Sequence, residues 1–117
     1  MSHKLLLVTV SILVFFSSCL SERVQRKMEL ENSILNECDF IHEVVYDELG
    51  VRVSGGDYVD LCGQVSEYCT KALMEEKETS EIVEIARNTH LLRREIKRCL
   101  TRNNKSFRLQ VAHFKSD

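Results

Sequence analysis

Between residues 22 and 49, apolar side chains recur at steps of three, four and seven, which is the spacing of one face of an α-helix. The positions on this face are Val24, Met28, Leu35, Cys38, Ile41, Val45 and Leu49. Gly50 follows at once, and glycine is common just beyond the end of a helix. The pattern predicts one helix over residues 22–49 and a loop over residues 51–57, most flexible at Gly55-Gly56.

A second apolar face begins after Asp57, a residue suited to cap the start of a helix. It consists of Tyr58, Leu61, Cys62, Val65, Cys69, Ala72 and Leu73. A third face, over residues 81–101, consists of Ile82, Ile85, Leu92, Ile96, Cys99 and Leu100. The sequence between them, MEEKETSE, contains no Gly or Pro, so one long helix through both segments is an alternative. Thr79 or Ser80 would cap a separate third helix.

The pattern changes after residue 102. Phe107, Leu109 and Val111 alternate with polar or small residues, which is typical of a strand. Residues 103–117 are therefore predicted to form an extended, basic tail that either pairs with residues 51–53 or stays loose.

The first 21 residues have the layout of a secretory signal peptide. Lys4 precedes an uncharged apolar run from Leu5 to Phe16, and small residues follow up to Ser21. This run is shorter than the roughly 20 residues that a membrane helix needs. We predict cleavage after Ser21, which leaves one domain over residues 22–102 and its tail. A lipid anchor at Cys19 is the alternative, because FSSC loosely resembles a lipid-attachment sequence.

The five cysteines become four when residues 1–21 are removed, and an even number in a short exported chain indicates disulfides. Cys62 and Cys69 lie seven residues apart, so one helix would hold their Cα atoms about 10.5 Å apart, beyond disulfide reach. Each must therefore bond to a different neighbouring helix. For three straight helices in up-down-up order, equal height predicts the bonds Cys38–Cys69 and Cys62–Cys99.

The residue spacings in this sequence do not match those of metal-binding or catalytic motifs. The cysteines are too widely separated for a zinc motif, and there is no CxxC sequence. His42-Glu43 begins like the HExxH protease motif, but Tyr46 stands where the second histidine is required. No nucleophile and base are paired by pattern. The sequence therefore predicts no enzyme, no cofactor and no metal.

Charge is strongly segregated along the chain. Residues 28–86 contain 15 acidic and 3 basic residues, whereas residues 87–117 contain 9 basic and 2 acidic ones. Arg87, Arg94, Arg98 and Arg102 follow at steps of seven, four and four, opposite the apolar face of the third helix. One interpretation is a solvated face that offsets the acidic helices. The other is a docking surface for an acidic partner, since arginine suits bidentate recognition.

Two modification patterns also occur. Asn104-Lys105-Ser106 is an N-glycosylation sequence, and Arg26-Lys27 is a dibasic pair at which a precursor could be cut.

These features predict a small all-α domain with two disulfides that is secreted and binds an extracellular partner, such as a hormone-like or cytokine-like ligand or an effector. The partner would be an acidic cell-surface receptor or other extracellular protein, a glycosaminoglycan or an anionic lipid, and not a nucleic acid. The alternative is an extracellular carrier of small apolar ligands or lipids. That alternative is similar in general style to the saposins, although they use six cysteines with tight outer pairs.

Overall fold

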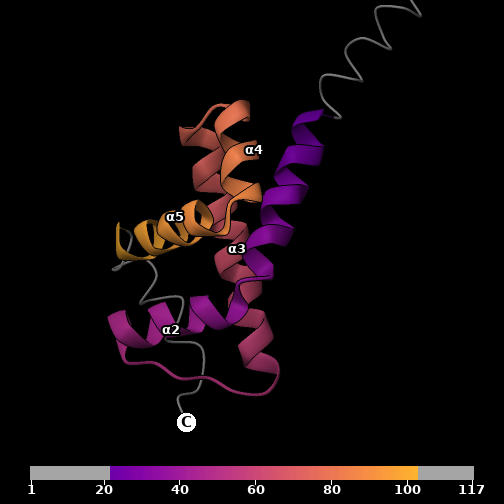
Figure 1. The fold of residues 1–117 in the computed structure, drawn as a ribbon. Coiled ribbons are helices and arrows are strands. Elements are labelled where there is room, and N and C mark those ends of the chain that lie inside the picture. Colours follow the sequence, from indigo (N-terminus) through magenta and orange to yellow (C-terminus); the bar gives the residue numbers. More distant parts are fainter. Residues whose placement is uncertain (1–21, 103–117) are drawn as a thin grey trace, which may run out of the picture.

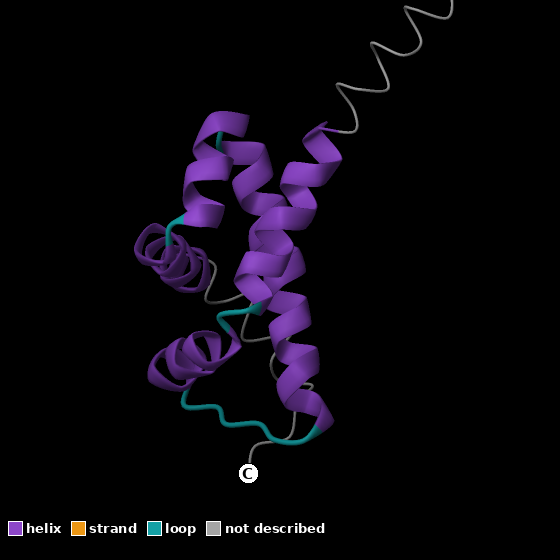
Figure 2. Ribbon diagram, turned by 45° about the vertical axis from the view of Figure 1, so that its right-hand side comes forward, coloured by secondary structure: helices purple, strands orange, loops and turns teal. Residues whose placement is uncertain are grey.

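Five helical segments make up most of residues 22–102, the part of the chain that the computed structural model describes (Figure 1). A first helix over residues 22–35 is followed by α2 (Cys38–Leu49), α3 (Gly56–Glu76), α4 (Thr79–Arg87) and α5 (Thr89–Arg102). Between residues 22 and 102 there is no strand (Figure 2). The all-α prediction is confirmed, but the predicted number of three helices is wrong. The predicted leader over residues 1–21 and tail over residues 103–117 lie outside the described residues.

The predicted helix over residues 22–49 is interrupted at Asn36 and Glu37, which form a turn. The backbone N–H of Glu37 donates to the carbonyl of Ile34 at 2.9 Å. A straight helix over this range would be about 42 Å long and would run past the core. The turn instead sends α2 across the lower end of α3 (Figure 1). Because of this turn, the side of the chain that faces the core before residue 36 does not continue as the buried side of α2.

In the first helix the buried side chains are Leu30 and Ile34, whereas Val24, Met28 and Leu35 are exposed. The face predicted for residues 22–35 is therefore wrong. The predicted apolar face continues along the same side of one helix to Ile41 and Val45, and these two residues are buried on α2. The turn at residues 36–37 interrupts that side, so each half of the segment packs on the core with its own face.

The end of α3 was expected in the MEEKETSE segment, and it does lie there. Lys77 and Glu78 are extended, and α4 begins at Thr79. The alternative of a single helix through this segment is wrong. A further break at Asn88 was not predicted. Asn88 is also extended, and its side-chain oxygen accepts a hydrogen bond from the N–H of Leu91 at 3.2 Å, so it caps the start of α5.

Glycine determines the loop between α2 and α3. Gly50 ends α2 with φ of 65° and ψ of 21°, the left-handed conformation that favours glycine, as predicted. Gly55 precedes α3 with φ of 63° and ψ of −138°, which side chains rarely allow. The residue before α3 is thus Gly55, and Asp57, the predicted cap, lies within the first turn.

The core lies where the helices meet around α3. Its apolar side chains come from every segment, and those with 3% exposure or less are Leu30, Ile34, Ile41, Val45, Leu61, Cys62, Val65, Cys69, Leu73, Ile82, Leu92, Ile96 and Leu100. Burying one such leucine or isoleucine stabilises the fold by about 1.5–3 kcal/mol. Among residues 22–102, no helix combines the length and the apolar character that crossing a membrane requires.

Candidate functional site

Two disulfides join the helices, in a pairing that differs from the predicted one. Cys38 is bonded to Cys62 with a Cα–Cα distance of 5.5 Å, and Cys69 to Cys99 with 6.0 Å. The use of these cysteines in disulfides is confirmed, as is the expectation that Cys62 and Cys69 bond to different segments. The predicted bonds Cys38–Cys69 and Cys62–Cys99 are wrong.

The pairing prediction failed because it assumed straight helices of equal height. The turn at residues 36–37 sends α2 across the end of α3 where that helix begins, so Cys38 meets Cys62. The break at Asn88 turns α5 across α3 further along, where Cys69 lies (Figure 1). Each disulfide therefore fixes one of the crossing helices to α3, and each contributes about 2–4 kcal/mol to stability.

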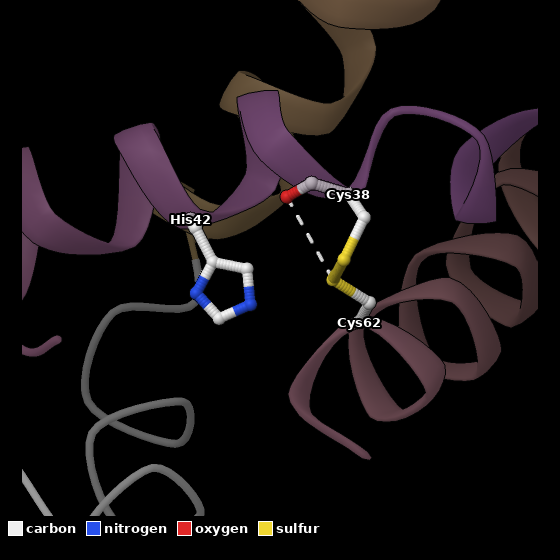
Figure 3. A group of neighbouring side chains, drawn as sticks. All are labelled: Cys38, His42 and Cys62. Atoms are coloured by element: carbon white, nitrogen blue, oxygen red, sulfur yellow. Dashed lines mark hydrogen bonds between the residues drawn. A yellow bond between two sulfur atoms is a disulfide. The ribbon is translucent and has the colours of Figure 1, made fainter. Parts of the chain in front are cut away.

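The histidine of the failed protease motif lies beside the first disulfide. His42 follows Cys38 by one turn of α2, and Cys62 faces both from α3 (Figure 3). One ring nitrogen of His42 and the two sulfur atoms all lie within 4.8 Å of one another. As long as the sulfurs are bonded to each other they are not thiolates, the form in which cysteine binds metals.

Tyr58 of α3 holds the His42 ring in place. The two rings are stacked, with 3.6 Å between centroids and 4° between planes. Nε2 of His42 lies 2.9 Å from the backbone oxygen of Tyr58. The hydroxyl of Tyr58 donates a hydrogen bond to Asp39, and this bond is the main reason why the pKa of Tyr58 is raised. Asp39, one turn before His42, thus bonds to the tyrosine that stacks on the histidine.

A hollow of about 270 Å³ opens beside this group. Its lining consists of Asp39, His42, Glu43, Tyr46, Val51, Arg52, Val53 and Tyr58. The guanidinium carbon of Arg52 lies 3.8 Å from the centre of the Tyr46 ring, a cation–π contact. The hollow lies against His42 and Tyr58, and neither cysteine of the disulfide lines it.

The structure divides the four predicted binding arginines. Arg87 belongs to α4, and its Nε atom lies 2.8 Å from Oε1 of Glu29 in the first helix. This contact is the foremost cause of the lowered pKa of Glu29, which Arg26 lowers further at 3.0 Å and burial opposes. Because of the break at Asn88, Arg87 does not continue the row formed by the other three arginines on α5.

The basic side chains at the edges of α5 are anchored by carboxylates. On one edge, Arg93 lies 2.6 Å from Glu37. On the other, Arg98 and Arg102 lie 3.3 Å and 3.4 Å from Glu76 of α3. These ion pairs support the interpretation that the arginines offset acidic helices. The two pairs with Glu76 are largely exposed and worth at most about 1 kcal/mol each, whereas the Glu37 side chain is only 14% exposed.

The centre of the exposed surface of α5 differs from its edges in how its basic side chains are paired. His90, Arg94 and Lys97 follow one another at steps of four and three, and all are exposed. Within residues 22–102, neither Arg94 nor Lys97 makes an ion pair. We call Arg93, Arg94, Lys97, Arg98 and Arg102 the basic face. Of the predicted binding residues, Arg94 has the most freedom to meet a partner.

The sequence pattern places Arg93 and Lys97 at the flanks of the arginine row, whereas in the structure Lys97 lies one turn from Arg94 at the centre of the basic face. A second grouping was not predicted. Cys38 and His42 also stand one turn apart, a spacing that places two metal ligands on one side of a helix. The predicted glycosylation residue Asn104 lies outside the described residues.

Comparison of the chain with models of protein families, with curated protein sequences and with solved structures found no match. The two disulfides and the small helical domain are compatible with an extracellular protein.

Proposed function

We propose that this protein is a secreted binding protein that docks on an acidic extracellular partner through the basic face of α5. The observation that carries the proposal is the pair Arg94 and Lys97, exposed at the centre of that face without an ion pair among the described residues. Residues 89–102 contain five basic residues and one acidic residue. A surface of this kind attracts an oppositely charged partner and orients it during approach.

The ion pairs at the edges of the face restrict the arginines without covering them. Arg93 contacts Glu37, and Arg98 and Arg102 contact Glu76, while all three arginine side chains stay about half exposed. Preorganised groups bind more tightly because less side-chain entropy is lost. We expect Arg94 and Lys97 to make the contacts that contribute most, with the anchored arginines around them.

The location of the protein is part of the proposal. Residues 1–21 would direct export and be removed after Ser21, and the disulfides would form in the oxidising compartment. The mass of the exported protein tests this step. A chain that begins at Glu22 supports it, whereas a chain that begins at a lipid-modified Cys19 would show that the protein is anchored to a membrane.

The binding surface can be tested with a matched pair of variants. The test variant is Arg94→Glu/Lys97→Glu, and the control is Arg23→Glu/Lys71→Glu, which makes the same change in net charge at exposed positions on the first helix and α3. Both proteins and the wild type are immobilised and used to capture proteins from an extract of cell surfaces. We expect an acidic protein to be enriched by the wild type and the control and lost from the test variant.

Three other results would change the assignment. Equal capture by both variants would show that the basic face is not the binding surface. Retention on heparin or on anionic vesicles without capture of a protein would identify a polyanion or a lipid surface as the partner. A lipid that co-purifies with the protein in native mass spectrometry would favour the carrier function instead.

A further inference from the structure

The group formed by Cys38, His42 and Cys62 has the composition of a metal site, although its sulfurs are joined. We propose that reduction of the Cys38–Cys62 disulfide creates a site for a divalent transition-metal ion such as Zn²⁺, bound by the two thiolates and one nitrogen of His42. Two sulfurs and one imidazole suit zinc, and a fourth position would remain open for water.

The backbone already brings the three ligands together. Their donor atoms lie within 4.8 Å of one another. In a tetrahedral site with metal–sulfur distances of about 2.3 Å and metal–nitrogen distances of about 2.0 Å, the donors are roughly 3.5–3.8 Å apart. The sulfurs must separate after reduction and the nitrogen must move slightly closer. The Cα atoms of Cys38 and Cys62 are 5.5 Å apart, so side-chain rotation can make this change.

His42 is positioned before any metal arrives. Its ring is held by stacking on Tyr58 and by the contact of Nε2 with the Tyr58 carbonyl. To bind the metal, the imidazole presents one unprotonated nitrogen and keeps its proton on the other. Outer contacts that fix the orientation of a histidine strengthen its binding to metals.

The two disulfides differ in their exposure to a reductant. Cys38 is only partly buried at the first residue of α2, although its partner Cys62 is 1% exposed. In the other disulfide both cysteines are buried, with Cys69 0% exposed and Cys99 8% exposed.

The chemistry requires an external reductant, for which a dithiol is sufficient. The dithiol breaks the Sγ–Sγ bond, leaves two cysteine thiols and is itself oxidised to a cyclic disulfide. Binding of the metal then releases the two thiol protons to water, and the metal keeps its oxidation state. The site therefore exists only in the reduced protein.

Cobalt(II) is the probe, because thiolate ligands give it a charge-transfer absorption and tetrahedral geometry gives it strong visible bands. The purified protein is titrated with Co²⁺ before and after treatment with a water-soluble phosphine, which adds no competing thiol. We expect both signals only in the reduced protein, and their loss when Zn²⁺ is added. His42→Phe, which keeps a ring against Tyr58, should weaken binding at least about tenfold.

Matched variants separate this site from the other cysteines. His90→Phe changes an exposed histidine on α5 and should leave the cobalt signals unchanged. Cys38→Ser should remove the tetrahedral signal, and Cys99→Ser should keep it. Equal binding by the His42→Phe variant and the wild type would overturn the proposal. So would a reduced protein that loses its helical circular dichroism and does not regain it with Co²⁺.

Discussion

The buried hydroxyl of Ser66 donates a hydrogen bond of 2.8 Å to the backbone carbonyl of Glu31, 35 positions earlier in the chain. This contact joins α3 to the first helix. One turn further along α3, the hydroxyl of Thr70 is also buried but has no hydrogen-bond partner within residues 22–102. The two side chains offer a direct comparison of a satisfied and an unsatisfied buried hydroxyl.

We expect Ser66→Ala to lower the free energy of unfolding by about 1 kcal/mol, because a net hydrogen bond is lost. Thr70→Val should leave it unchanged or raise it, because the new methyl group replaces a hydroxyl that was buried without a partner. Urea unfolding of both variants measures the two effects. A larger loss for Thr70→Val than for Ser66→Ala would contradict the hydrogen bonding described here.

The ion pair between Glu29 and Arg87 predicts a pH dependence of stability. The pKa of Glu29 is lower in the folded protein than its usual value, mainly because of Arg87. Its contribution is therefore present above the unfolded pKa, near 4.5, and is lost as the pH falls through the lower folded value. Glu29→Gln should reduce the melting temperature slightly at neutral pH and have no effect in strong acid.

The control for this experiment is Glu84→Gln, which changes an exposed carboxylate on α4. Within the described residues Glu84 makes no ion pair, so its replacement should not depend on pH in this way. Thermal unfolding followed by circular dichroism at several pH values compares the two. A difference for Glu29→Gln that persists in strong acid would rule out the ion pair as its cause.

The contact of Tyr58 with Asp39 predicts an unusual tyrosine. The carboxylate of Asp39 accepts the phenolic hydrogen bond and so raises the pKa of Tyr58 above 10.0. Because the folded value is the higher one, the contact stabilises the protein below the unfolded pKa and ceases to do so as the pH rises through the folded pKa. Ultraviolet titration should show a tyrosine that ionises above the usual pKa, and Asp39→Ala should reduce this shift while the smaller effect of burial remains.

Much of the helical structure follows from local pattern, whereas the breaks that shape the fold do not. Gly50 ends α2 as expected, because a left-handed conformation at that position favours glycine. Asn36 and Asn88 are weaker signals, since asparagine occurs both inside helices and at their ends. Whether the chain turns there depends on how Leu30, Ile34 and Leu92 reach a common core, which is a property of the packed helices.

The errors at the candidate sites have the same origin. The disulfide pairing and the continuous row of arginines were both derived from straight helices. Once the chain bends at residues 36–37, Cys38 reaches Cys62, and once it bends at Asn88, Arg87 leaves the row. The proximity of His42 to Cys62 also depends on how α2 crosses α3, which residue spacing within α2 does not specify.

The difference in burial between the two disulfides gives a prediction that also tests their pairing. Cys62, Cys69 and Cys99 are buried and only Cys38 is partly exposed, so a reductant that attacks the Cys38 sulfur should open the Cys38–Cys62 bond first. The folded protein is treated briefly with a phosphine, the free thiols are alkylated, and the labelled cysteines are identified by peptide mapping. Labels should appear together on Cys38 and Cys62 while Cys69 stays joined to Cys99. Early labelling of Cys38 with Cys69 would show that the cysteines are paired differently. Simultaneous labelling of all four cysteines, in protein that retains its fold, would show that burial does not protect the Cys69–Cys99 bond.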